Sequence, residues 1–352
     1  MLQSYNKTRQ TIGWIWFSLF TITFNLPAVA SEQTSLTIGF GSCSDQKREQ
    51  PIWDKIAAHN PELFILMGDN VYIDSADPQK MKVAYQAFSN KPEFKKFRKQ
   101  VPLVATWDDH DYGARDGGKE FDGKQNAKKA FLKFFDYPEL APVKSRNGGI
   151  YHTKWIDFND KKIQIILLDT RWYRDQLVDS YLTESQRETV NLGPYQPSFE
   201  QGITILGQKQ WKWLENELKK PADLKLLVSS IQVLTEYSGW EIWANFPAER
   251  KKLLDMLQQH TDDNLLILSG DIHRAEIVEV KHQNSRLLEI TSSGLAVKTY
   301  PAAVNKHRVG NAFTKKNYGM IKIKNGPKLS ASITIFDENG QAQLTTNMAA
   351  QQ

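Results

Sequence analysis

The chain has 352 residues, of which 40% are hydrophobic and 24% charged, with 20 glycines and 14 prolines. This composition is typical of a globular protein with a sizeable core and excludes a low-complexity or disordered chain. The net charge of +5 is spread along the sequence without an arginine-rich block, so there is no nucleic-acid-binding signature. The single cysteine, Cys43, excludes an intramolecular disulfide.

Residues 1–30 have the order of parts of a secretory signal peptide. Basic residues precede the mostly apolar run Ile12–Leu26, and the small-residue triplet A-V-A follows and ends at Ala30. We expect a Sec-type signal that is cleaved there, a mature domain of residues 31–352, and a periplasmic or extracellular location. The alternative is an uncleaved anchor, but the run is short and half-polar for a span, so no stable membrane span is expected after cleavage.

The rest of the chain alternates strand patterns with helical ones. Six continuous apolar runs have strand length and are bounded by Gly, Pro, Asp or Ser, which is typical of strands buried on both faces. These runs are residues 36–40, 63–67, 102–105, 163–168, 224–228 and 265–268. Helical periodicity follows Gly207 and again Pro247, before which Asn245 is a candidate N-cap. The alternation favours an α/β sandwich.

The C-terminal part alternates apolar with polar residues, as antiparallel strands with one solvent-exposed face do. These segments are residues 275–281, 287–291, 318–324 and 329–337. No linker and no internal repeat divides the chain, so we predict one domain after the signal. Two long polar stretches, residues 174–206 and 298–317, are either disordered or shape a site, and residues 340–352 have the pattern of a frayed tail.

Side chains of the kinds that bind metals follow the predicted strands. They are Cys43 after the first strand, Asp69 after the second, Asp108–Asp111 after the third, Asp169 after the fourth, and Asp271 with His273 after the sixth. The carboxyl ends of strands in an open α/β sheet meet at one edge, so these side chains are expected to converge. Carboxylates gathered in this way need a compensating cation, because each raises the pKa of its neighbours.

The donor types predict more than one metal. Clustered Asp oxygens suit Ca²⁺ or Mg²⁺, whereas Cys43, Tyr72 and His273 suit a transition metal such as Fe or Zn. Two cations about 3.5–4 Å apart are the usual clamp for phosphate-ester hydrolysis. Asp69, on the turn after Gly68, is the best candidate to bridge them.

Three of these features have structural alternatives. The segment W-D-D-H-D is either a metal or catalytic segment or a helix-capping cluster, and Cys43 is either a ligand or a core residue. Arg171 and Arg174 either bind phosphate or form structural ion pairs with nearby acids. The motifs G-x-S-x-G, G-x-G-x-x-G, H-E-x-x-H and the P-loop are all absent, which leaves metal-assisted hydrolysis.

Eight motifs in a fixed order resemble the PhoD-like alkaline phosphatases of the calcineurin-like metallophosphoesterase superfamily. They are G-S-C, G-D-N-V-Y, W-D-D-H-D-Y-G, L-D-T-R-W-Y-R, S-S-I-Q-V-L, W-A-N-F-P-A-E-R, S-G-D-I-H-R-A-E and T-S-S-G-L. The resemblance runs from about Leu36 to Lys324. It implies a four-layer αββα sandwich and a phosphohydrolase that uses Fe(III) together with Ca²⁺.

The resemblance also implies roles for matching positions. The implied transition-metal ligands are Cys43, Asp69, Tyr72 and His273. The implied ligands on the calcium side are Asp109 and Asp271, with Asp69 shared. His110 would stabilise the transition state or protonate the leaving oxygen, while Asp108 and Asp111 would support the ligands from behind.

One position departs from the family pattern. Relatives usually read Y-G-x-N-D, whereas this chain has Arg115 in place of the asparagine. Arg115 therefore either displaces a calcium or binds the phosphate, and Arg171 is the other candidate for substrate binding. The number of metals depends on which role Arg115 has.

These features lead to the hypothesis of an exported, metal-dependent phosphoester hydrolase in which metal-bound hydroxide attacks phosphorus in line. One alternative is a phosphodiesterase or phospholipase-type activity on phospholipid or teichoic-type polymers. The other is a non-catalytic metal-binding surface protein. Substrate choice is expected to reside in residues 174–206 and 298–317, and the oligomeric state is left open.

Overall fold

Twelve strands form one continuous sheet that folds into two layers. The structure is a computed structural model that describes residues 1, 3, 33–260, 264–282 and 285–348. The layers are joined where β1 (Ser35–Ser44) pairs in parallel with β11 (Ser285–Ala296). By their contacts, Gln33–Gln352 form one unit. Apart from Met1 and Gln3, the predicted signal peptide lies outside the described residues.

The first layer has the strand order β3-β2-β1-β12-β13-β14. Parallel to β1 run β2 (Leu63–Met67) and β3 (Leu103–Thr106). The antiparallel strands are β12 (Asn317–Lys324), β13 (Ser330–Asp337) and β14 (Ala342–Met348). The predicted frayed tail is therefore wrong over residues 342–348, because the backbone of this segment pairs with β13 although its side chains are mostly polar.

The second layer has the strand order β4-β5-β8-β9-β11-β10. Its parallel strands besides β11 are β5 (Lys161–Leu167), β8 (Leu224–Ser229) and β9 (Leu265–Ser269). Its antiparallel strands are β4 (His152–Phe158) and β10 (Ala275–His282). All six predicted buried strands are present. β4 was not predicted because most of its side chains are only partly buried and show no continuous apolar run.

The core between the layers follows from the alternation of side chains along each strand. Ile38 and Phe40 of β1 point to the same buried cluster as Ile165 of β5 and Leu226 of β8. The other face of each strand packs against helices. Because burial on both faces requires helices outside both layers, the implied αββα class is confirmed.

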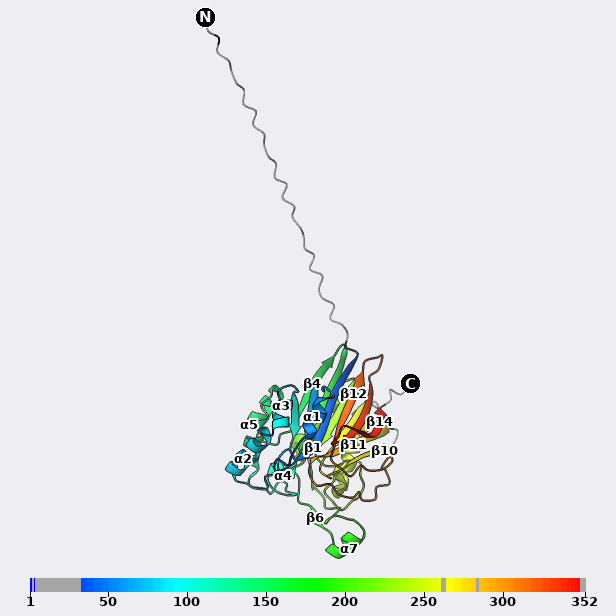
Figure 1. Ribbon diagram of the computed structural model, residues 1–352. Coiled ribbons are helices and arrows are strands. Elements are labelled where there is room, and N and C mark those ends of the chain that lie inside the picture. Colours follow the sequence, from blue (N-terminus) through cyan, green and yellow to red (C-terminus); the bar gives the residue numbers. More distant parts are fainter. Residues whose placement is uncertain (2, 4–32, 261–263, 283–284, 349–352) are drawn as a thin grey trace. The chain divides into compact units, whose positions relative to one another are not determined.

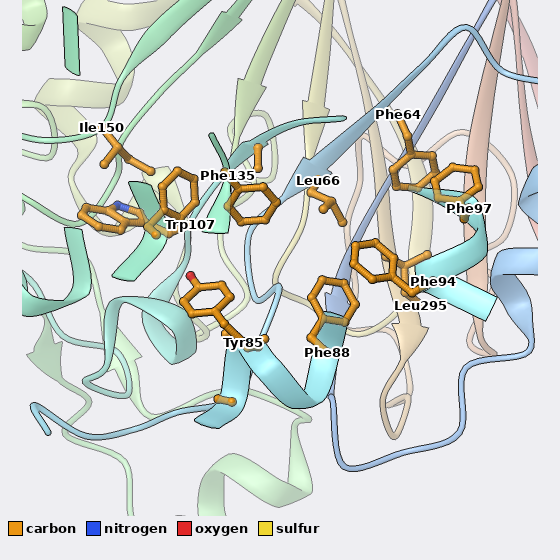
Figure 2. Packing of buried hydrophobic residues seen from close by; sticks show 14 of the residues in the cluster. Phe64, Leu66, Tyr85, Phe88, Phe94, Phe97, Trp107, Phe135, Ile150 and Leu295 are labelled. Atoms are coloured by element: carbon orange, nitrogen blue, oxygen red, sulfur yellow. The ribbon is translucent and has the colours of Figure 1, made fainter. Parts of the chain in front are cut away.

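An aromatic cluster covers the outer face of the first layer, where Phe64 of β2 lies among rings from two helices (Figure 2). The rings of Phe88 and Phe94 stack at 3.8 Å. The helices on this side are α1 (Ile52–Ala57), α2 (Pro78–Ser89), α3 (Pro92–Phe97) and α5 (Lys124–Phe134), of which α2, α3 and α5 lie together in Figure 1. Short helices follow at η1 (Pro138–Leu140) and α6 (Ala141–Ser145).

Two longer helices cover the outer face of the second layer. They are α8 (Gly207–Leu218) and α9 (Pro247–His260), and both begin where helical periodicity was predicted. Asn245 ends η2 (Trp243–Asn245), and its side-chain oxygen accepts from the N–H of Ile242 instead of capping α9. None of the described helices combines the length and apolarity needed to cross a membrane.

The two long polar stretches are ordered in different ways. Residues 174–206 contain β6 (Val178–Asp179), α7 (Glu184–Thr189) and β7 (Tyr195–Gln196), and the two strands pair with each other. This hairpin projects from the layers (Figure 1). Residues 298–316 lack helix and strand but are attached to β10 by isolated bridges at Phe313 and Arg308.

Candidate metal centre

The parallel strands bring the predicted donor residues to one edge of the two layers. Cys43 lies near the end of β1, Asp69 follows β2, α4 (Asp109–Tyr112) follows β3, and Asp271 follows β9. Their donor atoms form three groups, each with all atoms within 4.8 Å of one another: Cys43 with Asp69 and His273, Asp69 with Asp109 and His110, and Asp108 with Asp109 and Asp271. Because Asp69 and Asp109 each belong to two groups, the donors form one continuous array.

The soft end of the array contains a thiol, a phenol and an imidazole. Cys43 Sγ lies 3.7 Å from Asp69 Oδ2, and Tyr72 Oη lies 3.1 Å from His273 Nε2. Sγ also lies 3.1 Å from the hydroxyl of Ser293, which accepts from the N–H of His273. Sulfur, phenol and imidazole donors in one group suit a transition metal.

The hydrogen bonds of His273 define which ring nitrogen is available to a metal. Its Nδ1 lies 2.8 Å from the carbonyl oxygen of Lys298, which only accepts, so Nδ1 carries the proton and Nε2 keeps its lone pair. Burial lowers the pKa of His273 to about 4, so the ring is neutral at pH 7. A neutral imidazole fixed through its second nitrogen is the usual form of a histidine ligand.

The acidic end of the array is held by main-chain and arginine contacts. The N–H of Asp116 donates to Asp109 Oδ2 at 2.9 Å. Burial alone would raise the pKa of Asp109, but the charges of Arg171 and His110 and the Asp116 N–H outweigh it and lower that pKa to about 2. Asp108 Oδ2 is buried and has no hydrogen-bond partner. An unpartnered carboxylate oxygen within a three-acid group is an observation that fits a bound cation.

Electrostatics indicates the same need for cations. Burial, and then the charge of Asp109, raises the pKa of Asp69 well above its usual range, and burial with Asp108 and Glu241 does the same for Asp271. Burial raises the pKa of the Cys43 thiol to about 12. A cation among these groups would favour their charged, ligating forms. The donors present therefore fit a pair of metal ions.

His110 lies at the side of the array, on α4. Its Nδ1 lies 2.6 Å from Asp74 Oδ1, its N–H donates to Asp69, and its ring lies 4.0 Å from that of Tyr72. Although burial lowers the pKa of His110, the hydrogen bond to Asp74 and the nearby acids raise it above the ordinary value. No local pattern marked Asp74, because its partner is 36 residues away along the chain.

Four of the donor residues have left-handed backbone conformations. Their φ angles are 62° at Cys43, 52° at Asp69, 70° at Asp271 and 51° at His273. This region is unfavourable for side chains with a Cβ and costs on the order of 1–3 kcal/mol at each residue. Several strained residues at one place are typical of a functional site, where the backbone adopts an unfavourable conformation that orients side chains toward one another.

Arg171 forms the structural ion pairs that the sequence left as one of two alternatives. Its guanidinium is fully buried and contacts Asp108 at 2.5 Å and Glu241 at 2.7 Å. Arg174 lies 3.0 Å from Glu241 in the same network. With these contacts made and no exposed surface, Arg171 is not placed to bind a substrate in this structure.

Two predicted acids support the backbone around the array. Asp111 accepts from the N–H of Asp108 and from both nitrogens of Asn70, which holds the turn after β2 against α4. Asp169 accepts from the N–H groups of Arg171, Trp172 and Ile150 and from the indole of Trp107. Asp169 was expected to converge with the donors, but it belongs to none of the three groups, and both of its oxygens accept the hydrogen bonds named above.

Comparison with known proteins identifies the family. A family model described as PhoD-like phosphatase matches residues 38–348. The chain belongs to the PhoD-like phosphatase family. This confirms the resemblance drawn from the eight motifs.

The relatives differ considerably from this member of the family in sequence. Alkaline phosphatase D of Bacillus subtilis (strain 168) is 21% identical over 290 residues, which cover 71% of this chain and 48% of that protein, so the chain spans about half the length of this relative. A solved structure of PhoD has a TM-score of 0.66 at 16% identity and covers 93% of this chain and 74% of that one. A dimetal phosphatase from Danio rerio has a TM-score of 0.52 at 11% identity, covering 90% of this chain and 99% of that one. The two structural matches show a shared fold.

A cleft of about 280 Å³ opens beside the array in this PhoD-like chain. Its lining includes the buried Asp69 and Asp109 and the partly buried Asp271, and the exposed Arg115 also borders it. Trp240 and Tyr300 border it as well and were not predicted. Both lie in irregular segments where no periodicity or motif distinguishes a cleft-lining ring from an ordinary surface ring.

Proposed function

We propose that this chain is a metal-dependent phosphoester hydrolase. The observation that carries the proposal is the continuous array in which Asp69 and Asp109 are shared between donor groups at the edge of a cleft. Membership of the PhoD-like phosphatase family supports the same reaction class. A shared carboxylate between a soft and a hard donor group is the arrangement that a two-metal phosphoesterase needs.

The donor chemistry assigns a preferred metal to each end. Cys43, Tyr72 and His273, with Asp69, would hold Fe(III), and Asp109 and Asp271, with Asp69 shared, would hold Ca²⁺. When bound, such cations supply an activated water for in-line attack on phosphorus and neutralise charge on the phosphoryl oxygens. The rigid carboxylates keep these positions fixed while the substrate enters.

His110 and Arg115 are the residues that would act on the substrate directly. Asp74 occupies Nδ1 of His110, so Nε2 is the atom left to donate a proton to the leaving oxygen or to stabilise the transition state. Arg115 lines the cleft with an exposed side chain, which suits a bidentate contact with phosphate. In its other role it would displace a calcium, and the number of calcium ions per chain distinguishes the two.

We also propose that the chain is exported. The basic, apolar and small-residue order of residues 1–30 supports a Sec-type signal cleaved after Ala30. N-terminal sequencing of the protein recovered from outside the cytoplasm tests this. A first residue of Ser31 is expected, whereas an intact N-terminus in that fraction would contradict the cleavage.

The hydrolase proposal is tested by turnover and elemental analysis of the same preparations. The wild-type chain is expected to hydrolyse a chromogenic phosphate ester and to contain iron and calcium. Asp69→Asn is expected to lose turnover and bound metal while remaining folded, because its carboxylate is the shared ligand. Asp54→Asn, on an exposed pair with Lys96, is the matched control.

Two results would overturn the proposal. If Asp69→Asn kept wild-type activity, the Asp69 carboxylate would not be the shared ligand that the proposed reaction needs. Metal-loaded wild-type protein without turnover on any phosphate monoester or diester would favour the non-catalytic metal-binding alternative. Comparing monoester with diester turnover separates a phosphatase from a phosphodiesterase.

A further inference from the structure

The cleft combines a buried polar floor with an aromatic rim. Asp69, Asp109 and Asp271 on the floor are buried or nearly so. The rim includes Trp240 and Tyr300, whose side chains remain 45% and 47% exposed. These two rings come from chain segments 60 residues apart, so local sequence does not bring them together. The floor suits a phosphoryl group and the rim suits an apolar group attached to it.

Exposed apolar side chains are not spread evenly over the described part of the chain. Apart from Met1 and Val83, the large exposed ones all belong to residues 174–206, 231–246 and 298–317. Among them, only Trp240 and Tyr300 line the cleft. Their position at the cleft, and not their exposure alone, sets these two rings apart from the other exposed ones, and a ring left half-exposed at a pocket is a feature of ligand sites.

The backbone of Trp240 is anchored on both sides by its neighbours in the chain. The next residue, Glu241, is 2% exposed and pairs with the buried Arg171 and Arg174. The previous residue, Gly239, packs so closely on Gly193 that a Cβ at Gly193 would lie 2.2 Å from the Gly239 carbonyl oxygen. The buried ion pairs of Arg171 and Arg174 with Glu241 thus fix the backbone that carries the ring.

Tyr300 is fixed against the metal-binding histidine. Its ring stacks on that of His273 at 5.5 Å and 18°. The carbonyl of Lys298 accepts from His273 Nδ1, and the ammonium of Lys298 lies 5.5 Å from the centre of the Tyr300 ring. Asn191 donates to the carbonyl of Ala302 and so links the two loops beside the rim. The Tyr300 ring and the backbone that carries Trp240 are therefore in place before a ligand arrives, which reduces the entropy lost on binding.

We infer that this rim is a subsite for a planar ring, and that the favoured substrates are phosphoesters whose organic group is an aryl or heterocyclic ring rather than a small polyol. The inference rests on the proposed hydrolase function and adds the identity of the group next to phosphorus. A volume of about 280 Å³ suits one small molecule. Stacking on tryptophan and tyrosine faces selects flat, unsaturated groups.

The test compares two substrates across rim variants of the metal-loaded enzyme. The quantity measured is kcat/KM for phenyl phosphate divided by kcat/KM for glycerol phosphate. Trp240→Ala and Tyr300→Ala are each expected to lower this ratio by about tenfold relative to wild type, since that is the typical worth of one aromatic stack. Trp240→Phe and Tyr300→Phe keep a ring and are expected to retain most of the ratio. Differences in leaving-group reactivity cancel because each variant is compared with wild type on the same substrate.

Tyr181→Ala is the matched control, because Tyr181 is 92% exposed and does not line the cleft. It is expected to leave the ratio unchanged. A ratio that Trp240→Ala and Tyr300→Ala also leave unchanged would overturn the inference, whether both rates fall together or neither falls. Thermal melting of each variant shows that it is folded, and half-exposed positions are expected to tolerate alanine.

A binding experiment separates failure of this inference from failure of the proposed function. Calorimetry measures the affinity of the metal-loaded protein for phenylphosphonate and for methylphosphonate. Tighter binding of the phenyl compound, lost in Trp240→Ala, supports the ring subsite even if the protein hydrolyses no phosphoester. Equal affinities for the two compounds in an active enzyme would overturn the subsite and leave the hydrolase proposal intact.

Discussion

Arg171 Nε donates to Asp108 Oδ1 across 2.7 Å, and both side chains are buried at the acidic end of the donor array. The same guanidinium reaches Glu241 on the segment that carries the cleft rim. One buried cation thereby connects the floor of the site with its mouth. Because a buried charge without a partner is costly, this residue is expected to matter more for stability than its distance from the cleft surface suggests.

Replacing Arg171 with methionine is expected to lower the free energy of unfolding by about 3 kcal/mol or more, since Asp108 and Glu241 lose their buried partner. Denaturant titration measures this. Lys219→Met, at the exposed pair with Glu215, is expected to cost less than about 1 kcal/mol. A stable Arg171→Met enzyme with a much higher KM would instead favour substrate binding by Arg171.

Cys43→Ser is expected to remove the transition-metal part of the site. Burial raises the pKa of this thiol to about 12, so a bound cation is needed to keep it as thiolate. Wild-type protein loaded with iron should show a visible charge-transfer band, and the variant should lose that band and part of its iron. If the variant keeps both colour and activity, Cys43 is a core-packing residue.

Removing metal is expected to lower the melting temperature of the wild-type chain. Burial and neighbouring charges raise the pKa of both Asp69 and Asp271, so the charged forms of these carboxyl groups are unfavourable in the folded chain. A bound cation stabilises the charged forms and therefore the folded state. A ligand at 100 times its Kd stabilises a protein by about 2.7 kcal/mol. Melting curves with and without a chelator measure the shift, which should be much smaller in Asp69→Asn. Identical curves for treated and untreated wild-type protein would argue against a bound metal.

Stability is expected to fall in mild acid because of His152. This side chain is 3% exposed, with Nε2 near the Tyr137 hydroxyl and Nδ1 near the carbonyl of Ile150, and burial lowers its pKa from 6.5 to about 4. Between these values the unfolded chain binds a proton more readily than the folded one, so stability is full above about pH 6.5 and decreases towards pH 4. The loss attributable to His152 is about 3 kcal/mol.

Denaturant titrations at several pH values measure this loss, and His152→Gln is the control. Glutamine keeps a polar group at this position but has no titrating ring. Its stability should decrease less between pH 6.5 and pH 4 than that of the wild type. Parallel pH profiles for the two proteins would show that His152 does not cause the decrease.

Much of the fold followed from local pattern. The continuous apolar runs of β1, β2, β3, β5, β8 and β9 identified strands buried on both faces, because such strands need apolar side chains at every position. Parallel strands share an edge, so residues just after them, such as Asp69 and Asp271, were expected to meet. The strand β14 escaped prediction because most of its side chains are polar: it is held by backbone pairing with β13, and only Leu344 and Met348 pack, partly buried, against the core.

The sequence by itself determined which strands are buried and which donor residues lie at their ends, since both are set by the order of neighbouring residues. Only the tertiary structure decided that Arg171 turns inward to Glu241, 70 residues away, and that Asp74 contacts His110. It also decided that Trp240 and Tyr300 border one cleft. The physical reason is that a side chain's partner depends on which segments pack together, and the sequence around that side chain carries little information about segments far along the chain.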